Sequence, residues 1–241
     1  MRDLAWDGYP NARDLGGLPT PLSPTGTTAF GRVARGPRRE LLTDSGWAAA
    51  STWGLRTVVD LRCPHEVGLR DGDPAVSPGA LNGTIVISAP TEDQSDPEFQ
   101  RVCFPILDSP EYWQHNWRLQ PRLVRTTFET IAAARPGMLV HCSAGRDRTG
   151  MISALLLGNA GVPPDVVADD YARSVRAMAG SASHAPTTDR QAAWTAAEVD
   201  DWLTTATPPV RETAERAAEI FDTLGVAHPV RTRLRDLLTA P

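Results

Sequence analysis

The stretch HCSAGRDRTG, residues 141–150, contains one of only three cysteines in the 241-residue chain, and an arginine follows that cysteine six positions later. The apolar run GMLVHC before it is typical of a strand, and residues 148–160 after it favour a buried helix. The backbone of residues 143–148 can therefore curl so that its N–H groups point inward at the positive end of a helix. Gly145 permits the backbone angles that such a curl needs. This arrangement predicts an anion site suited to phosphate.

Two side chains beside this anion site could catalyse a reaction of bound phosphate. Helix N-termini and neighbouring cations favour the thiolate, so Cys142 is predicted to be an anion at neutral pH and a nucleophile toward bound phosphorus. Arg148 can offer two N–H groups to two phosphate oxygens and stabilise the transition state. The residues expected to hold the phosphate are Ser143, Ala144, Gly145, Arg146, Asp147 and Arg148. This chemistry requires no metal ion and no cofactor, whereas a buried, unreactive thiol is the alternative for Cys142.

The motif Cys142-Ser-Ala-Gly-Arg-Asp-Arg148-Thr149 resembles the signature of cysteine-dependent protein tyrosine phosphatases. Together with NARDLGG at 11–17 and the segments LLTDSG and LRTVVDLR within 41–62, it is similar to the bacterial subfamily whose loop carries an aspartate just before the arginine. The resemblance implies hydrolysis of phosphate monoesters through a phosphocysteine, with phosphotyrosine on a protein as the expected substrate. Three alternatives stay open: a dual-specificity or phosphoinositide phosphatase, a rhodanese-like sulfur transferase, and a phosphate-binding module that has lost catalysis.

Three aspartates compete for the role of general acid, because the sequence lacks the Trp-Pro-Asp loop of many relatives. Asp147 is ranked first, since bound phosphate favours its protonated form. Asp60 is second, because it ends a predicted strand and the carboxyl ends of parallel strands converge on a site. Asp108, in a loop before a Trp-bearing helix, is third. Each has a structural alternative: orienting an arginine, pairing with Arg62 or Arg13, or forming a turn.

Supporting roles are predicted for Thr149 and Asp14. The hydroxyl of Thr149 could hydrogen-bond the sulfur of Cys142, or it could bond to backbone in the first turn of the helix. Asp14 belongs to the segment that lies close to the phosphate loop in the subfamily. Cys63 could protect Cys142 through a reversible disulfide, although an unreactive thiol is the favoured interpretation.

The elements that must position these residues alternate between strands and helices, which predicts an α/β fold with a central, mostly parallel sheet flanked by helices. Strands are expected at 56–62, 83–88 and 137–142. An irregular loop is expected at 89–108 and another loop at 180–195. Helices are expected at 41–54, from Ser109 onward as one helix or as two helices broken near Pro121, and at 148–160, 163–178, 196–205, 209–224 and 229–239. Residues 1–179 are interpreted as a phosphatase core, and residues 180–241 as a helical, lid-like C-terminal segment packed on the same domain.

Composition narrows the class of protein further. The net charge of −5 and the pI near 5.5 argue against a nucleic-acid partner. All 24 basic residues are arginines, so no lysine is available as a nucleophile. No signal peptide is visible, and no apolar run approaches the roughly 18–20 residues of a membrane span. The cysteines are odd in number, which argues against a disulfide framework. Together these features predict a reduced, cytoplasmic protein.

Overall fold

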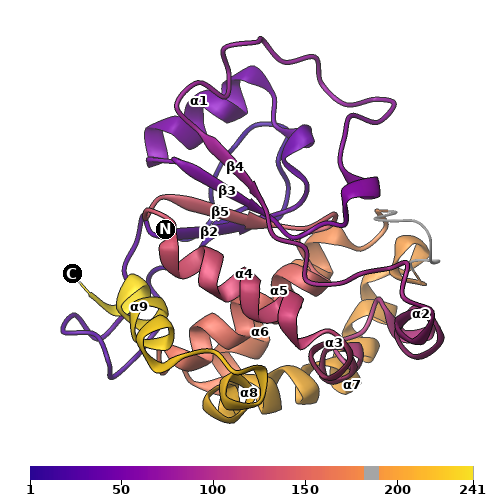
Figure 1. The fold of residues 1–241 in the computed structure, drawn as a ribbon. Helices are drawn as coiled ribbons and strands as arrows, with labels where there is room; N and C mark the ends of the chain where they lie inside the picture. Colours follow the sequence, from indigo (N-terminus) through magenta and orange to yellow (C-terminus); the bar gives the residue numbers. More distant parts are fainter. Residues whose placement is uncertain (182–189, 241) are drawn as a thin grey trace.

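A sheet of short strands lies at the centre of the computed structural model, which describes residues 1–181 and 190–240 (Figure 1). Its order is β1-β2-β5-β3-β4. The strands are β1 (Arg13–Asp14), β2 (Val33–Gly36), β3 (Thr57–Asp60), β4 (Ile85–Ser88) and β5 (Met138–His141). Only β1 is antiparallel to its neighbour. The predicted α/β class with a mostly parallel sheet is confirmed.

The register of the parallel strands aligns their carboxyl ends. His141 of β5 pairs with Gly36 of β2 and with Asp60 of β3, and Asp60 in turn pairs with Ser88 of β4. The segments that leave these strands therefore emerge along one edge of the sheet, where ligands bind in open α/β folds.

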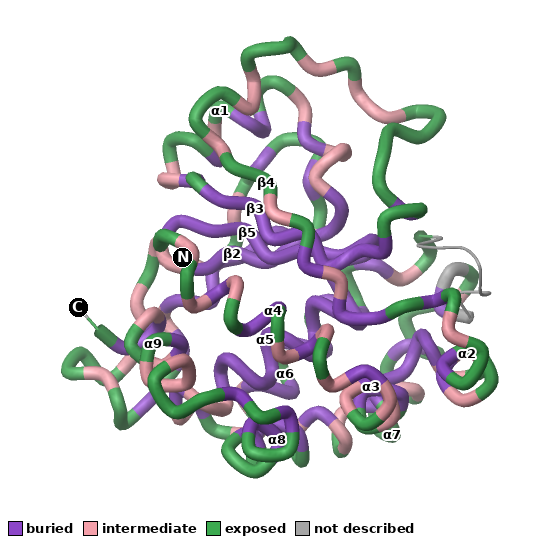
Figure 2. Tube along the Cα trace, in the orientation of Figure 1, coloured by how far each residue is buried: buried purple, intermediate pink, exposed green. Residues whose placement is uncertain are grey.

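Each strand sends alternate side chains to opposite faces, because side chains in a strand have a period of two. Ala34, Val58 and Leu139 pack in a small cluster with helix α1 (Asp44–Trp53). Val33, Val59 and Val140 belong to the larger cluster on the other face. Figure 2 shows β2, β3 and β5 as a buried band between these two layers.

The larger cluster is built around α5 (Asp147–Asn159), in which every residue from Asp147 to Leu157 is buried. This confirms the predicted central helix. Helices α4 (Pro121–Ala133), α6 (Pro164–Met178), α7 (Ala196–Glu215), α8 (Ala217–Leu224) and α9 (His228–Thr239) complete this layer (Figure 1). Thr43 caps α1 and Thr195 forms a capping box at α7, as their sequences predict.

The predicted irregular loop at 89–108 is wrong in its second half. Residues 97–103 form helix α2 (Pro97–Cys103), and the 3₁₀ helix η3 (Phe104–Ile106) follows. Asp96 caps α2 and Pro97 occupies its first turn, a pairing that favours a helix start. The next helix, α3 (Tyr112–Leu119), begins after Ser109, and of the two alternatives the structure has two helices separated near Pro121.

The predicted helix boundary between residues 205 and 209 is also wrong. Helix α7 continues through Pro208 and Pro209 and ends at Glu215. Its buried stripe runs through the prolines, from Leu203 through Ala206 to Val210. Packing of this stripe on α5 and α6 outweighs the two lost backbone hydrogen bonds.

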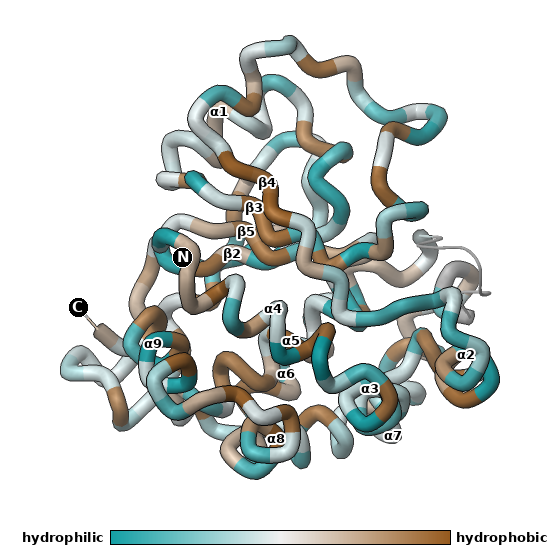
Figure 3. Tube along the Cα trace, viewed as in Figure 1, coloured by the Kyte–Doolittle hydropathy of each residue, from teal (hydrophilic) through white to brown (hydrophobic). Residues whose placement is uncertain are grey.

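Strand β4 is an apolar edge strand with one open side. Ile85 is 65% exposed and Val86 39% exposed, and Figure 3 shows apolar colouring along this strand at the sheet edge. Most of the loop predicted at 180–195 lies outside the described residues, which resume with the 3₁₀ helix η4 (Arg190–Ala193). None of the described helices is long and apolar enough to cross a bilayer.

Candidate active site

Cys142 lies directly after β5, and α5 begins five residues later at Asp147, so the phosphate loop, defined as residues 142–148, links the central strand to the central helix. The cysteine is 2% exposed. It lines a small hollow, here called the Cys142 pocket. The other lining residues are Glu92, Leu107, Tyr112, Ser143, Ala144, Asp147 and Arg148. The predicted loop and helix start are thus present, and Cys142 stands at the positive end of the helix.

Gly145 gives the loop its curl. Its φ is +68°, and a Cβ atom there would lie 2.4 Å from the backbone of Gly36 at the end of β2. Glycine is therefore needed for both its backbone conformation and the close approach of the two segments.

Hydrogen-bond donors from outside the loop, two side chains and one backbone N–H, bind its carbonyl groups. Arg35 Nη2 donates to the carbonyl of Gly145 at 2.8 Å, and Asn11 Nδ2 donates to the carbonyl of Ala144 at 3.3 Å. The backbone N–H of Arg38 donates to the carbonyl of Ser143 at 2.9 Å. With carbonyls tied to the surrounding protein, the loop is suited to offering N–H groups to an anion.

Arg148 is anchored by two buried carboxylates. Its two terminal nitrogens donate to the two carboxylate oxygens of Glu66, with Nη2 to Oε1 at 2.7 Å. Its Nη1 also lies 3.4 Å from Oε1 of Glu92. Burial opposes ionisation of Glu66, but the hydrogen bonds and charge of Arg148 lower its pKa below the ordinary value. Glu66 therefore fixes the guanidinium beside Cys142.

Glu92 has a different environment although it touches the same arginine. It is 2% exposed, and its Oε2 has no hydrogen-bond partner among the described residues. Burial raises its pKa above the ordinary value despite the opposing charge of Arg148. The Cys142 pocket is thus lined by one carboxyl group whose pKa burial shifts upward.

Asp60 lies in a buried network of charges beside the site. It accepts hydrogen bonds from Arg62 Nε at 2.9 Å and from Arg39 Nη1 at 2.6 Å. Burial alone would raise its pKa, but Arg62 and the neighbouring His141 lower it well below the ordinary range. Asp60 does not line the Cys142 pocket. The predicted pairing with Arg62 is present, whereas Arg13 pairs with Asp170.

Of the other predicted acids and supporting residues, only Asp147 lines the Cys142 pocket. The two carboxylate oxygens of Asp147 accept from Arg146 Nε at 3.1 Å each. Asp108 is buried, and its carbonyl accepts from Gln191.

The hydroxyl of Thr149 is buried and has no hydrogen-bond partner among the described residues. Asp14 braces turns by accepting from the backbone of Gly16 and Gly31 and from Trp53, and it does not line the pocket.

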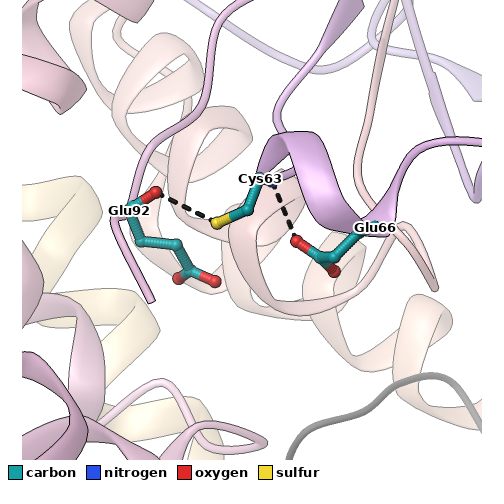
Figure 4. A group of neighbouring side chains, drawn as sticks. All are labelled: Cys63, Glu66 and Glu92. Carbon is teal, nitrogen blue, oxygen red and sulfur yellow. Dashed lines mark hydrogen bonds between the residues drawn. The ribbon is translucent and has the colours of Figure 1, made fainter. Parts of the chain in front are cut away.

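Cys63 lies next to Glu66 and Glu92, the two residues whose carboxylates hold Arg148 (Figure 4). Its Sγ donates to the carbonyl of Glu92 at 3.1 Å, and its N–H donates to Glu66 at 2.9 Å. Burial raises the pKa of this thiol to about 12, which favours the unreactive interpretation over a protective disulfide. The donor atoms of Cys63, Glu66 and Glu92 lie within 4.8 Å of one another, as in a cation site. Because Arg148 already engages both carboxylates, we interpret the cluster as its anchor.

Sequence reasoning missed both glutamates. Glu66 follows Asp60 by six residues in the 3₁₀ helix η2 (Pro64–Glu66), and Glu92 follows β4. Both therefore leave the same edge of the sheet as Cys142, so the rule that ranked Asp60 could have found them. The carboxylate of Asp170, which holds Arg13 and Arg35, had no such signal because it lies within α6.

The proteins that this chain resembles are named as phosphatases. The model of the tyrosine phosphatase family matches residues 4–240. The triple specificity protein phosphatase PtpB of Mycobacterium tuberculosis is 31% identical over an alignment of 201 residues, and this alignment covers 72% of this chain and 69% of the relative. A tyrosine-protein phosphatase of Nostoc commune is 33% identical over an alignment of 145 residues, and this alignment covers 58% of this chain and 47% of that protein. The alignments thus span about two thirds of the first relative and about half of the second.

Proposed function

Because the chain belongs to the tyrosine phosphatase family, we propose that it hydrolyses phosphotyrosine on proteins through a phosphocysteine formed on Cys142. The observation that carries this proposal is the position of Cys142 in one pocket with Arg148, at the N-terminus of the buried helix α5. The broader class, a phosphoric monoester hydrolase, agrees with the names of both relatives. The name of the first, a triple specificity phosphatase, keeps a wider substrate range open. The cytoplasmic location stays a prediction.

In the proposed reaction the Cys142 thiolate attacks phosphorus, and the bond from phosphorus to the tyrosine oxygen breaks. The amides of residues 143–148 and the guanidinium of Arg148 bind the three equatorial oxygens, where charge develops. Water then attacks the phosphocysteine and releases phosphate and the thiolate. The unpartnered hydroxyl of Thr149 can hydrogen-bond this departing sulfur.

The leaving tyrosine oxygen takes its proton from a carboxyl group, and we propose Asp147 for this role. Asp147 lines the pocket and belongs to the phosphate loop itself, where the leaving oxygen of the substrate would lie. Glu92 is the second candidate, because it lines the same pocket and burial raises its pKa. Asp60 ranks below both, since two arginines hold it as an anion outside the pocket. Asp108 does not line the pocket either.

The first experiment measures hydrolysis of p-nitrophenyl phosphate in EDTA by the wild type and by Cys142→Ser. Activity in the wild type and none in the variant is the expected result. Activity that survives in Cys142→Ser would contradict the cysteine mechanism. A clean wild type that binds phosphate and hydrolyses no monoester would instead indicate a phosphate-binding module.

A second experiment selects the acid by comparing a good leaving group, p-nitrophenolate, with a poor one, phenolate. Loss of the acid matters most for the poor leaving group, so Asp147→Asn should lower kcat for phenyl phosphate by about 100-fold or more and affect p-nitrophenyl phosphate far less. Glu92→Gln should lower both rates by similar factors if Glu92 only positions Arg148. The reverse pattern would assign the proton to Glu92.

A further inference from the structure

The segment Val67–Arg70, here called the rim segment, follows directly after Glu66 and is unusually apolar for an exposed stretch. Val67 is 43% exposed and Leu69 77% exposed, which places both among the few large apolar side chains that the described residues leave open to solvent. Since Glu66 is bound to Arg148, the rim segment begins beside the phosphate loop.

Three arginines gather near this segment, and two of them are neutralised. Arg38 is paired with Asp73, and Arg62 is paired with Asp60 and Glu40.

Arg70, the third, forms no ion pair with any described residue, since no carboxylate oxygen lies within 4.0 Å of its guanidinium there. Partial burial, together with the charges of Arg38 and Arg62, lowers its pKa. The charges of Glu66 and Asp73 oppose this shift but do not reverse it. The charge of Arg70 is therefore incompletely compensated and incompletely hydrated, and an anion would stabilise it.

The position of Arg70 is fixed by the surrounding structure. Its backbone N–H donates to Asp73 Oδ2 at 2.7 Å, and Arg38 donates to the same oxygen at 2.6 Å. The backbone of Arg38 is in turn bound to Ser143 of the phosphate loop. The guanidinium of Arg70 lies 3.5 Å from the hydroxyl of Ser143, but Arg70 does not line the Cys142 pocket. It stands at the edge of the site, outside the position of the transferred phosphate.

We propose that the rim segment is a substrate-binding subsite, in which Arg70 binds an acidic side chain close to the phosphotyrosine of a peptide and Val67 and Leu69 contact its apolar neighbours. This proposal rests on the proposed function and adds a substrate class to it. An extended peptide advances about 3.4 Å per residue, so an acidic residue one or two positions from the phosphotyrosine is within reach of the site's edge. The two exposed apolar side chains favour a peptide over a small polyphosphate, which offers nothing for them to contact.

The test uses two phosphotyrosine peptides that differ only in their flanking residues, aspartate in one and asparagine in the other. The wild type should show a kcat/KM about three- to tenfold higher for the aspartate peptide, the range expected for a partly exposed charge-assisted contact. Arg70→Gln should remove this preference, and Arg70→Lys should restore part of it. Arg233→Gln, an exposed arginine on α9, is the matched control and should keep the preference of the wild type.

Several outcomes would overturn the subsite. One is a wild type without preference between the peptides, and another is an Arg70→Gln variant that retains the preference. If Arg70→Gln instead weakens only the hydrolysis of phosphoinositide in vesicles, the subsite serves a lipid headgroup and the peptide proposal is wrong. Failure of the proposed function is separable, because binding of both peptides can be measured with Cys142→Ser even if no turnover is found.

Discussion

At the scale of the single residue, the contacts of Arg148 decide how the site is built. Its guanidinium is buried, and burial opposes its charge, yet Glu66 and Glu92 raise its pKa well above the ordinary value. An arginine held by a bidentate contact has one orientation and loses little freedom when a phosphate arrives. Glu66 is therefore a positioning residue for the proposed chemistry.

Glu66→Gln should lower kcat/KM for p-nitrophenyl phosphate by about 10- to 100-fold, because the amide cannot accept both N–H groups of Arg148. Steady-state kinetics on folded protein measures this effect. Glu98→Gln is the control, since Glu98 forms an ion pair with Arg101 on the surface of α2. Equal activity of Glu66→Gln and the wild type would show that Arg148 does not need the carboxylate of Glu66 to hold it.

At the scale of the element, the loop between β5 and α5 depends on Gly145. Alanine there would meet both the positive φ and the backbone of Gly36, so Gly145→Ala should abolish phosphate binding and lower the free energy of unfolding by several kcal/mol, more than the ~1 kcal/mol expected for a positive φ alone.

Gly26→Ala separates these two costs. Gly26 has φ +74° and open space around its Cβ position, so this variant should lose only the smaller amount and keep its activity. Urea unfolding and phosphate titration of both variants provide the comparison. A Gly145→Ala variant with normal phosphate affinity would contradict the role given to this close approach.

The end of β5 also makes stability depend on pH. Burial lowers the pKa of His141 from 6.5 to about 4, and its neutral ring donates from Nδ1 to the carbonyl of Cys142. Between these two values the unfolded chain takes up a proton that the folded chain does not. The contribution of neutral His141 to the free energy of unfolding is fully present above about pH 6.5. Up to a few kcal/mol of it is lost as the pH falls to about 4.

Urea unfolding at several pH values across this interval measures that loss. His141→Asn removes the titrating group and should flatten the dependence between the two pKa values. Below about pH 4, Asp60 adds a further loss in both proteins, because its pKa is depressed and protonation breaks its contacts with the arginines. An unchanged slope in His141→Asn would contradict this assignment.

At the scale of the whole molecule, Asp170 joins parts of the chain that are far apart in sequence. From α6 it binds Arg13 at 2.8 Å and Arg35 at 2.6 Å, and it also contacts Arg2. Because Arg35 also binds the carbonyl of Gly145, this carboxylate connects the N-terminal segment, the sheet and the phosphate loop. The C-terminal helices α7, α8 and α9 each contact α5 from the same side of the sheet, and their described residues do not line the Cys142 pocket.

Asp170→Asn should lower the free energy of unfolding by about 3–5 kcal/mol, because it leaves buried arginines without their counter-charge. It should also weaken phosphate binding, since Arg35 loses its support. Asp165→Asn on the same helix is the control, because Asp165 is 82% exposed and pairs with Arg211 on the surface. Similar stability of the two variants would show that the buried network contributes little.

Features that depend only on neighbours along the chain could be predicted from the amino-acid sequence. The phosphate loop, its helix, the alternation of strands and helices and the caps Thr43 and Thr195 are all local patterns, and the structure confirms these elements. The resemblance to tyrosine phosphatases is confirmed by the family match. The division at residue 179 and the role of each site residue stay predictions.

Features that depend on residues far apart in the sequence could not be predicted from local patterns. Local rules end a helix at Pro208, but packing on α5 and α6 carries α7 through it. Glu66 and Glu92 are ordinary glutamates in the sequence. They become partners of Arg148 because the parallel register brings the ends of β3, β4 and β5 to one edge. Burial raises the pKa of both carboxyl groups, but Arg148 binds both oxygens of Glu66 and lowers its pKa below the ordinary value. One oxygen of Glu92 has no partner among the described residues, and its pKa stays above the ordinary value.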